Sequence, residues 1–191
     1  LMATGAYATA EQIALHATQI RAIELDPLYR NGDYPLHGPQ PLQGLTLARS
    51  IAQITYGSER DLATTFHRRP EAGNDPIRAG RYAVEAHLEQ HSEVVARRLD
   101  ANSYIALTRA MSHHDIGRDR GGVRAALSRI QARTRVLSIA SDRLFPPRLQ
   151  QEIAQGIGSG LTYSSIDSAH GHDGFLCEHR QLSDILRQTL G

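Results

Sequence analysis

Apolar residues recur at helical spacing through the first two thirds of the chain. In residues 9–25 they fall on one helical face, at Ile13, Ala17, Ile20 and Ile23. Thr9 precedes Gln12 by three positions, a capping-box spacing that predicts where this helix starts. Asp26-Pro27 ends the helix because proline disfavours helical geometry in the residue before it. Similar patterns predict further helices at residues 45–56, 58–67, 82–99, 102–113 and 121–131.

The pattern changes at Arg135, where the short apolar run 136–140 is typical of a strand buried on both faces. A helix is predicted at 147–157, a second strand at 161–166 and a last helix at 175–190. This β-α-β-α order predicts an α/β fold with a parallel sheet. Residues 1–5 resemble the end of another buried strand, which gives about three strands in all. So small a parallel sheet would leave an open edge, and we expect residues outside this chain to complete it.

Composition narrows the choice of partner and compartment. The 191 residues are 40% hydrophobic and carry a formal net charge of +1, so we expect neither nucleic acid nor an anionic membrane as a partner. No apolar stretch approaches the length of a membrane span, and no signal peptide is visible. The single cysteine, Cys177, excludes an internal disulfide, suits a cytoplasmic location and is expected to be packed. The first residues, Leu1-Met2, suggest a piece of a longer polypeptide.

Two ionisable residues follow the last two predicted strands. Asp142 comes directly after the strand ending at Ala140, and His172 follows the strand ending near Ile166. Ligands bind beyond the carboxyl ends of strands in open α/β sheets. An acid and then a histidine in this order matches the α/β-hydrolase triads, whose nucleophile comes earlier in the chain. Asp142 taken alone could equally cap the helix that begins near Pro146.

A series of ordered segments resembles the homoserine O-acetyltransferase family, and the resemblance covers essentially the whole chain. The segments are Ala8-Thr9-Ala10-Glu11-Gln12-Ile13-Ala14, Asp26-Pro27 with Gly32-Asp33-Tyr34, Asp100-Ala101-Asn102-Ser103-Tyr104, Ser141-Asp142-Arg143-Leu144-Phe145-Pro146 and Gly171-His172-Asp173-Gly174-Phe175-Leu176. In addition, residues 114–117 and 121–123 resemble the actinobacterial branch. The resemblance implies the C-terminal half of an α/β-hydrolase fold. Residues 1–8 would be a strand end of the core, 9–131 an inserted helical lid, and 132–191 the part that carries the triad acid and base.

The resemblance also implies roles for individual residues. Asp142 would be the triad acid and His172 the triad base, while Arg49 would bind the substrate carboxylate. Tyr56 would line the same site, and Asp173 would hold the substrate amino group. A zwitterion such as homoserine needs one fixed cation and one fixed anion, and a planar guanidinium suits bidentate carboxylate binding. Arg49 taken alone could instead be a surface arginine whose alkyl stem covers apolar residues.

The implied reaction is a ping-pong transfer of acetyl from acetyl-CoA, a co-substrate, to the hydroxyl of L-homoserine, as in methionine biosynthesis. A homodimer through the lid helices and the absence of a permanently bound cofactor are implied as well. No metal site is expected: His87 and His91 have a zinc-binding spacing, but Leu88 stands where the metalloprotease motif has glutamate.

The chain departs from the family pattern at two places. It contains no Gly-x-Ser-x-Gly nucleophile elbow; Gly156-Ile157-Gly158-Ser159-Gly160 has the wrong spacing and follows a helix. We therefore expect the serine in a missing N-terminal half, and no transferase activity from these residues alone. The second departure is His170, a rival base where relatives commonly have tyrosine.

Alternative functions remain open from the sequence alone. The acceptor could be serine or an antibiotic hydroxyl, and the donor could be succinyl-CoA. A plain hydrolase would use water as the acceptor, although Arg49 and Asp173 would then have no substrate charges to bind. A non-catalytic fragment that acts as a dimerisation module is the alternative from a different class.

Overall fold

A computed structural model describes residues 1–35, 37–73, 75–158 and 160–190. The chain folds into two compact units. The first unit comprises Leu1–Ala8, Thr55–Asp61 and His113–Gly191, and the second comprises Thr9–Ile54 and Leu62–Ser112. This division differs from the predicted boundary at residue 131, because residues 113–131 group with the sheet. In the described ranges, no helix is both long and apolar enough to cross a membrane.

The first unit is built on two parallel strands, β1 (Thr134–Ile139) and β2 (Leu161–Ile166). Their register runs from Thr134 opposite Leu161 to Ile139 opposite Ile166, so both strands end at the same level. The predicted strand at residues 1–5 forms only an isolated parallel bridge from Met2 to Leu137. Extended pairing stops there because Ala3 has a φ of 44°, in the left-handed region.

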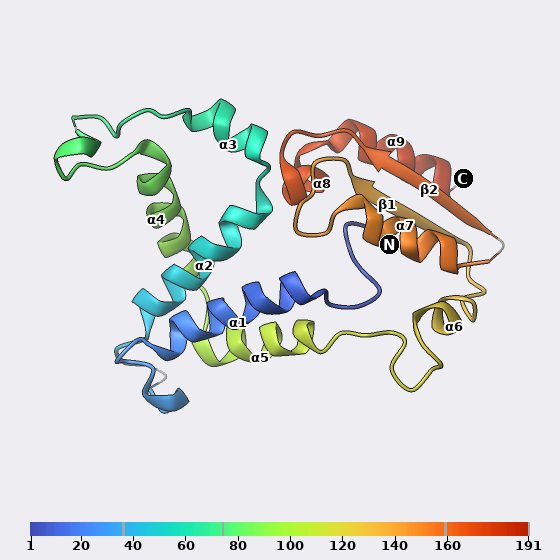
Figure 1. The fold of residues 1–191 in the computed structure, drawn as a ribbon, viewed down its shortest axis with the longest axis horizontal. Helices are drawn as coiled ribbons and strands as arrows, with labels where there is room; N and C mark the ends of the chain where they lie inside the picture. The colour runs from blue at the N-terminus through green and yellow to red at the C-terminus, as the bar shows by residue number, and fades with distance from the viewer. Residues whose placement is uncertain (36, 74, 159, 191) are drawn as a thin grey trace. The chain divides into compact units, whose positions relative to one another are not determined.

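Helices cover both faces of the two strands (Figure 1). On one face, Val136 belongs to an apolar cluster with residues of α6 (Val123–Leu127) and α7 (Pro147–Gly156). On the other face, Ile139 and Ile166 pack against α8 (Gly174–Cys177) and α9 (His179–Leu190). Helix α7 is the crossover that parallel strands require. The parallel α/β arrangement predicted from the sequence is therefore confirmed.

Two helices of the first unit differ from the prediction. The helix expected at 121–131 is only α6, since Gly121 and Gly122 have φ values of 80° and 91° and cannot continue a helix. The helix expected at 175–190 is broken into α8 and α9 at Glu178, whose φ and ψ are −87° and 55°. The side chain of Cys177, expected to be packed, is exposed at the end of α8.

The exit of the chain from the first unit after Ala8 and its last return at His113 are joined by one short antiparallel pairing. The N–H of Ala8 donates to the carbonyl of His114 at 2.9 Å, and the N–H of Ile116 donates to Ala6 at 3.0 Å. The ring Nε2 of His114 also lies 3.1 Å from the carbonyl oxygen of Gly5. These hydrogen bonds explain why the segment that follows residue 112 groups with the sheet.

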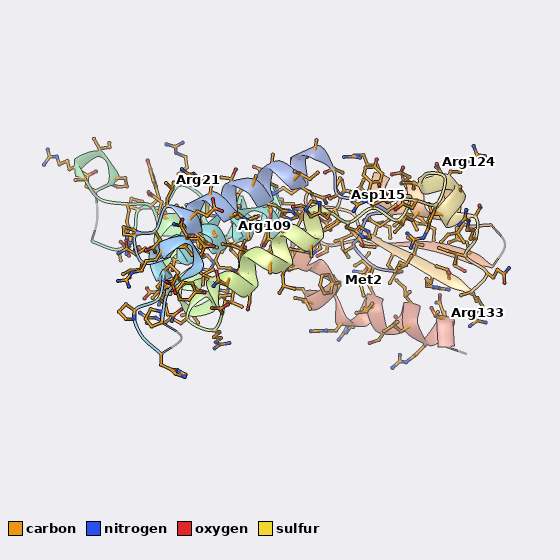
Figure 2. The ribbon with its side chains drawn as sticks, turned by 90° about the horizontal axis from the view of Figure 1, so that it is seen from below. Met2, Arg21, Arg109, Asp115, Arg124 and Arg133 are labelled. Atoms are coloured by element: carbon orange, nitrogen blue, oxygen red, sulfur yellow. The ribbon has the colours of Figure 1, made fainter. Side chains whose placement is uncertain are left out.

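The second unit is helical, with α1 (Ala10–Glu24), most of α2 (Leu42–Tyr56) and of α3 (Glu59–Phe66), α4 (Ala83–Ala96) and α5 (Ala101–Ser112). Short 3-10 turns occupy Arg30–Gly32 and Pro76–Arg78. The apolar core joins α1, α2, α4 and α5 through Ala22, Ile23, Leu45, Ala48, Ala96, Ala101 and Ile105. Helices α1 and α5, which carry Arg21 and Arg109, pack side by side (Figure 2). Glu24 forms ion pairs with both arginines.

Several segments that resemble the family hold the second unit together. The predicted capping box is confirmed, since Thr9 and Gln12 exchange both of its hydrogen bonds. The hydroxyl of Tyr34 donates to Asp100 and accepts from the N–H of Asn102 at 2.9 Å. The carboxylate of Asp26 accepts from the N–H of Gly44 at 2.8 Å, across the close approach of α1 and α2.

Candidate active site

Asp142 and His172 lie at the same edge of the sheet, in the loops that follow β1 and β2. Beyond β1 and β2, the N–H of Ala140 still donates to the carbonyl of Ile166 at 2.9 Å. The loops that follow the strands therefore start side by side. Asp142 lies in the first loop, and His172 lies in the second, on a 3-10 turn at Gly171–Asp173. Strand register thus brings together residues that are 30 positions apart.

The two side chains form a buried hydrogen bond. His172 Nδ1 lies 2.8 Å from Asp142 Oδ2, and the Asp142 side chain is 0% exposed. Its other oxygen, Oδ1, accepts from the N–H groups of Leu144 at 2.9 Å and Phe145 at 2.8 Å. The carboxylate therefore orders its own turn and still presents one oxygen to the imidazole. The N-cap of α7 is Pro146, so the helix-capping alternative for Asp142 does not account for its contacts.

This geometry fixes which ring nitrogen can accept a proton. A carboxylate only accepts hydrogen bonds, so Nδ1 of His172 is the protonated nitrogen of the neutral ring. Nε2 is then the lone-pair nitrogen, and no hydrogen bond to it is found within the described ranges. A histidine held by a buried carboxylate through Nδ1, with Nε2 available, is arranged as a general base.

Three aromatic rings surround the imidazole of His172, whose side chain is only 18% exposed. The ring centroid of Phe145 lies 5.4 Å away and that of Tyr56 5.9 Å away, both tilted relative to the imidazole. Phe175 meets the imidazole edge-on at 5.6 Å. Such rings limit the imidazole to one orientation. Sequence reasoning did not assign roles to Phe145 and Phe175, although each lies three residues from Asp142 or His172.

Two serines that sequence reasoning missed hold the loop before His172. Ser141 Oγ accepts from the N–H of Gly171 at 3.0 Å and so ties the acid loop to the base loop. Ser58 donates its hydroxyl proton to the carbonyl of Ala169. The sequence signal for Ser141 was its place beside Asp142, whereas Ser58 is 111 residues away from Ala169 and had only a helix-capping signal.

The other predicted site residues are placed as follows. Asp173 directly follows His172 and is half-buried, and Tyr56 lies against the imidazole. Arg49 lies on α2, half-buried, in the second unit. The substrate-binding roles of Arg49, Tyr56 and Asp173 stay predictions. The rival base, His170, makes a separate contact with Asp61, 3.3 Å between Nδ1 and Oδ1, rather than one with Asp142.

Comparison with known proteins shows which enzymes the chain is similar to. Its 191 residues are 47% identical to a protein of Thermobifida fusca and 46% identical to one of Mycobacterium tuberculosis, both named homoserine O-acetyltransferase. By sequence, the chain is similar to the homoserine O-acetyltransferases over half of their length. The match covers all of the chain and 50% of each relative, so the chain spans about half the length of these relatives. No family model matches the chain.

Solved structures show the fold of the chain. A homoserine O-acetyltransferase from Bacillus anthracis has a TM-score of 0.86 at 23% identity, over 96% of this chain and 50% of that one. Esterase E22 has a TM-score of 0.86 at 21% identity, over 100% and 53%. An α/β-hydrolase enzyme from a deep-sea metagenome library, MGS-M2, has a TM-score of 0.60 at 14% identity, over 96% and 52%. The fold is thus that of the α/β-hydrolases, as the sequence predicted.

Proposed function

We propose that this chain supplies the acid and the base of an acyltransferase that moves acetyl from acetyl-CoA to the hydroxyl of L-homoserine. The observation that carries the proposal is the buried Asp142–His172 pair with Nε2 of His172 available. It occurs in a chain 46–47% identical to proteins named homoserine O-acetyltransferase. The nucleophilic serine would come from residues outside these 191, because the sequence contains no Gly-x-Ser-x-Gly elbow.

In the first half-reaction, the serine hydroxyl would attack the thioester carbon of acetyl-CoA while His172 Nε2 takes its proton. The tetrahedral intermediate would then break its carbon–sulfur bond, and the departing CoA thiolate would take the proton from His172. Asp142 would hold the imidazole in place and stabilise the imidazolium in between. The products of this step would be acetyl-serine and free CoA.

In the second half-reaction, His172 Nε2 would take the proton of the homoserine hydroxyl as its oxygen attacks the acetyl carbon. Collapse of the second intermediate would release O-acetyl-homoserine and return the proton to serine. Backbone N–H groups would stabilise both oxyanions. Arg49 would bind the homoserine carboxylate and Asp173 its ammonium group, opposite charges that a plain hydrolase would not need.

CoA release tests the proposal and separates its alternatives. The protein to assay joins these 191 residues to the half that carries the serine elbow. Acetyl-CoA would be offered with homoserine, with serine or with water alone, and succinyl-CoA with homoserine. We expect fast CoA release only with acetyl-CoA and homoserine, and none from the 191 residues alone. Release that is equally fast without an amino-acid acceptor would mean a hydrolase, and preference for another pair would reassign donor or acceptor.

A further inference from the structure

The segment Tyr56–Asp61, called the brace below, joins α2 to α3 and lies against the loop that carries His172. Residues 55–61 belong to the first unit, although the residues on either side, 9–54 and 62–112, belong to the second. The brace is therefore the part of the α2–α3 segment that packs on the loop carrying His172. Three independent contacts account for its position.

The first contact is backbone against backbone at Gly171, directly before His172. Gly171 has a φ of 65°, a conformation that side chains with a Cβ rarely adopt. A Cβ atom built there would lie 2.5 Å from the carbonyl oxygen of Tyr56 and 2.6 Å from the N atom of Ser58. The loop can therefore approach the brace this closely only because position 171 is glycine.

The second contact is a buried hydroxyl with both of its hydrogen-bonding functions used. Ser58, 5% exposed, donates to the carbonyl of Ala169 and accepts from the N–H of Asp61 at 2.9 Å. On the other side of the same loop, Ser141 accepts from the N–H of Gly171 at 3.0 Å. The residues that precede His172 are thus held from the brace and from the acid loop at once.

The third contact uses the second histidine of the loop. His170 Nδ1 lies 3.3 Å from Asp61 Oδ1, and the two side chains are 46% and 32% exposed. An exposed pair of this kind contributes little to stability by itself, because water screens it. It does, however, place the His170 ring against the first turn of α3. The contact with Asp61 gives His170 a structural role that does not require it to act as a base.

We propose that the brace is a positioning element for the base: Ser58 and the Asp61–His170 pair hold the loop 168–171 so that His172 stays aligned between Asp142 and the reacting hydroxyl. These residues would act through His172 and touch no substrate themselves. Displacement of a catalytic group by about 1 Å can slow a reaction by about 100-fold, so small loop movements are expected to be measurable. The kinetic part of the test rests on the proposed function, and the hydrogen-exchange part does not.

The decisive variant is Ser58→Ala, measured in the whole protein beside Ser58→Thr and the control Ser128→Ala. Ser128 is also in the first unit, but its hydroxyl bonds to Ala125 at an exposed helix end. We expect Ser58→Ala to raise amide hydrogen exchange in residues 168–173. We also expect kcat for acetyl transfer to fall about 10-fold with the homoserine KM changed less than about 2-fold, because His172 acts in the transition state. Ser58→Thr, which keeps the hydroxyl, should restore both values, and Ser128→Ala should match wild type.

The exposed pair provides a second test that does not depend on whether Ser58→Ala folds. Asp61→Asn and His170→Gln should each lower kcat about 2- to 3-fold. The kcat of the double variant should be no lower than that of the less active single variant, because both substitutions remove the same contact. The proposal for the brace would be overturned if Ser58→Ala matched Ser128→Ala in amide hydrogen exchange and in kcat. It would also be overturned if the losses of kcat in the Asp61 and His170 variants were additive. If the wild type transfers no acetyl to homoserine, the proposed function fails, and the exchange comparison alone decides the brace.

Discussion

A single proton position governs the chemistry of the candidate site. With Asp142 accepting from Nδ1 of His172, the neutral imidazole keeps its lone pair on Nε2. An asparagine at 142 could present its amide N–H₂ to Nδ1 and favour the opposite tautomer. We therefore expect Asp142→Asn to lower kcat by about 10³- to 10⁴-fold with the fold intact. Steady-state kinetics on the whole protein, beside Asp167→Asn in the same unit, will measure it. A loss of less than 10-fold would mean that Asp142 is only a turn former.

Gly171 is the residue whose replacement should move His172 most directly. An alanine there meets the carbonyl of Tyr56 and adopts a strained backbone with a φ of 65°. We expect Gly171→Ala to lower the unfolding free energy by about 1–3 kcal/mol and to reduce kcat by at least about 10-fold. Chemical denaturation and kinetics give the two numbers. The control is Gly158→Ala, where a Cβ meets nothing within 4 Å. Equal effects of both substitutions would contradict the close contact.

In the second unit, Tyr34 makes stability depend on pH through Asp100. The hydroxyl of Tyr34 donates to the carboxylate and lowers the pKa of Asp100 below its ordinary value of 3.8. A lowered carboxyl pKa contributes stability above that ordinary value, and the contribution is lost as the pH falls through the folded-state pKa. Tyr34→Phe should therefore cost more unfolding free energy at pH 7 than at pH 2. Denaturation of both proteins across this range will show the difference; a cost that does not change with pH would refute the coupling.

Among the helices, the start of α1 offers the sharpest test of a sequence rule. Thr9 accepts from the N–H of Gln12 at 3.2 Å, and Gln12 Oε1 accepts from the N–H of Thr9 at 2.9 Å. Thr9→Ala should lower the unfolding free energy by about 1 kcal/mol and Tm by about 2–4 °C. Thr18→Ala removes a hydroxyl from the exposed middle of the same helix and should change stability by less than about 0.5 kcal/mol. Equal losses in thermal unfolding would show that the capping box contributes nothing.

Element boundaries were predictable where one local interaction sets them. The capping box fixed the start of α1, and Asp26-Pro27 fixed its end, since both act within a few residues of the chain. The break at Glu178 and the left-handed Ala3 had no local signal, because neither residue type favours such a conformation. Residues 113–131 were predicted to belong with the helices before them, whereas they group with the sheet. Their pairing with residues 6–8 is a tertiary contact that periodicity does not contain.

Across the whole molecule, the contact between Asp142 and His172 could be predicted because strand order and register bring consecutive loop starts together. The surroundings of His172 could not be predicted in the same way. Tyr56 and Ser58 reach the loop from more than 100 positions away, and their contacts depend on the packed structure. A tyrosine at a helix end is commonly a packing residue, and a serine before a helix is commonly an N-cap, so neither residue type alone indicates a contact with His172.

We propose that His172, held by Asp142, is the base of a homoserine acetylation whose serine lies outside these 191 residues. The most direct measurement is homoserine-dependent CoA release by the whole protein, compared between wild type, His172→Gln and His170→Gln. We expect a loss of about 10³-fold or more in His172→Gln and of no more than about 3-fold in His170→Gln. Transfer that survives in His172→Gln, or that disappears in His170→Gln, would contradict it.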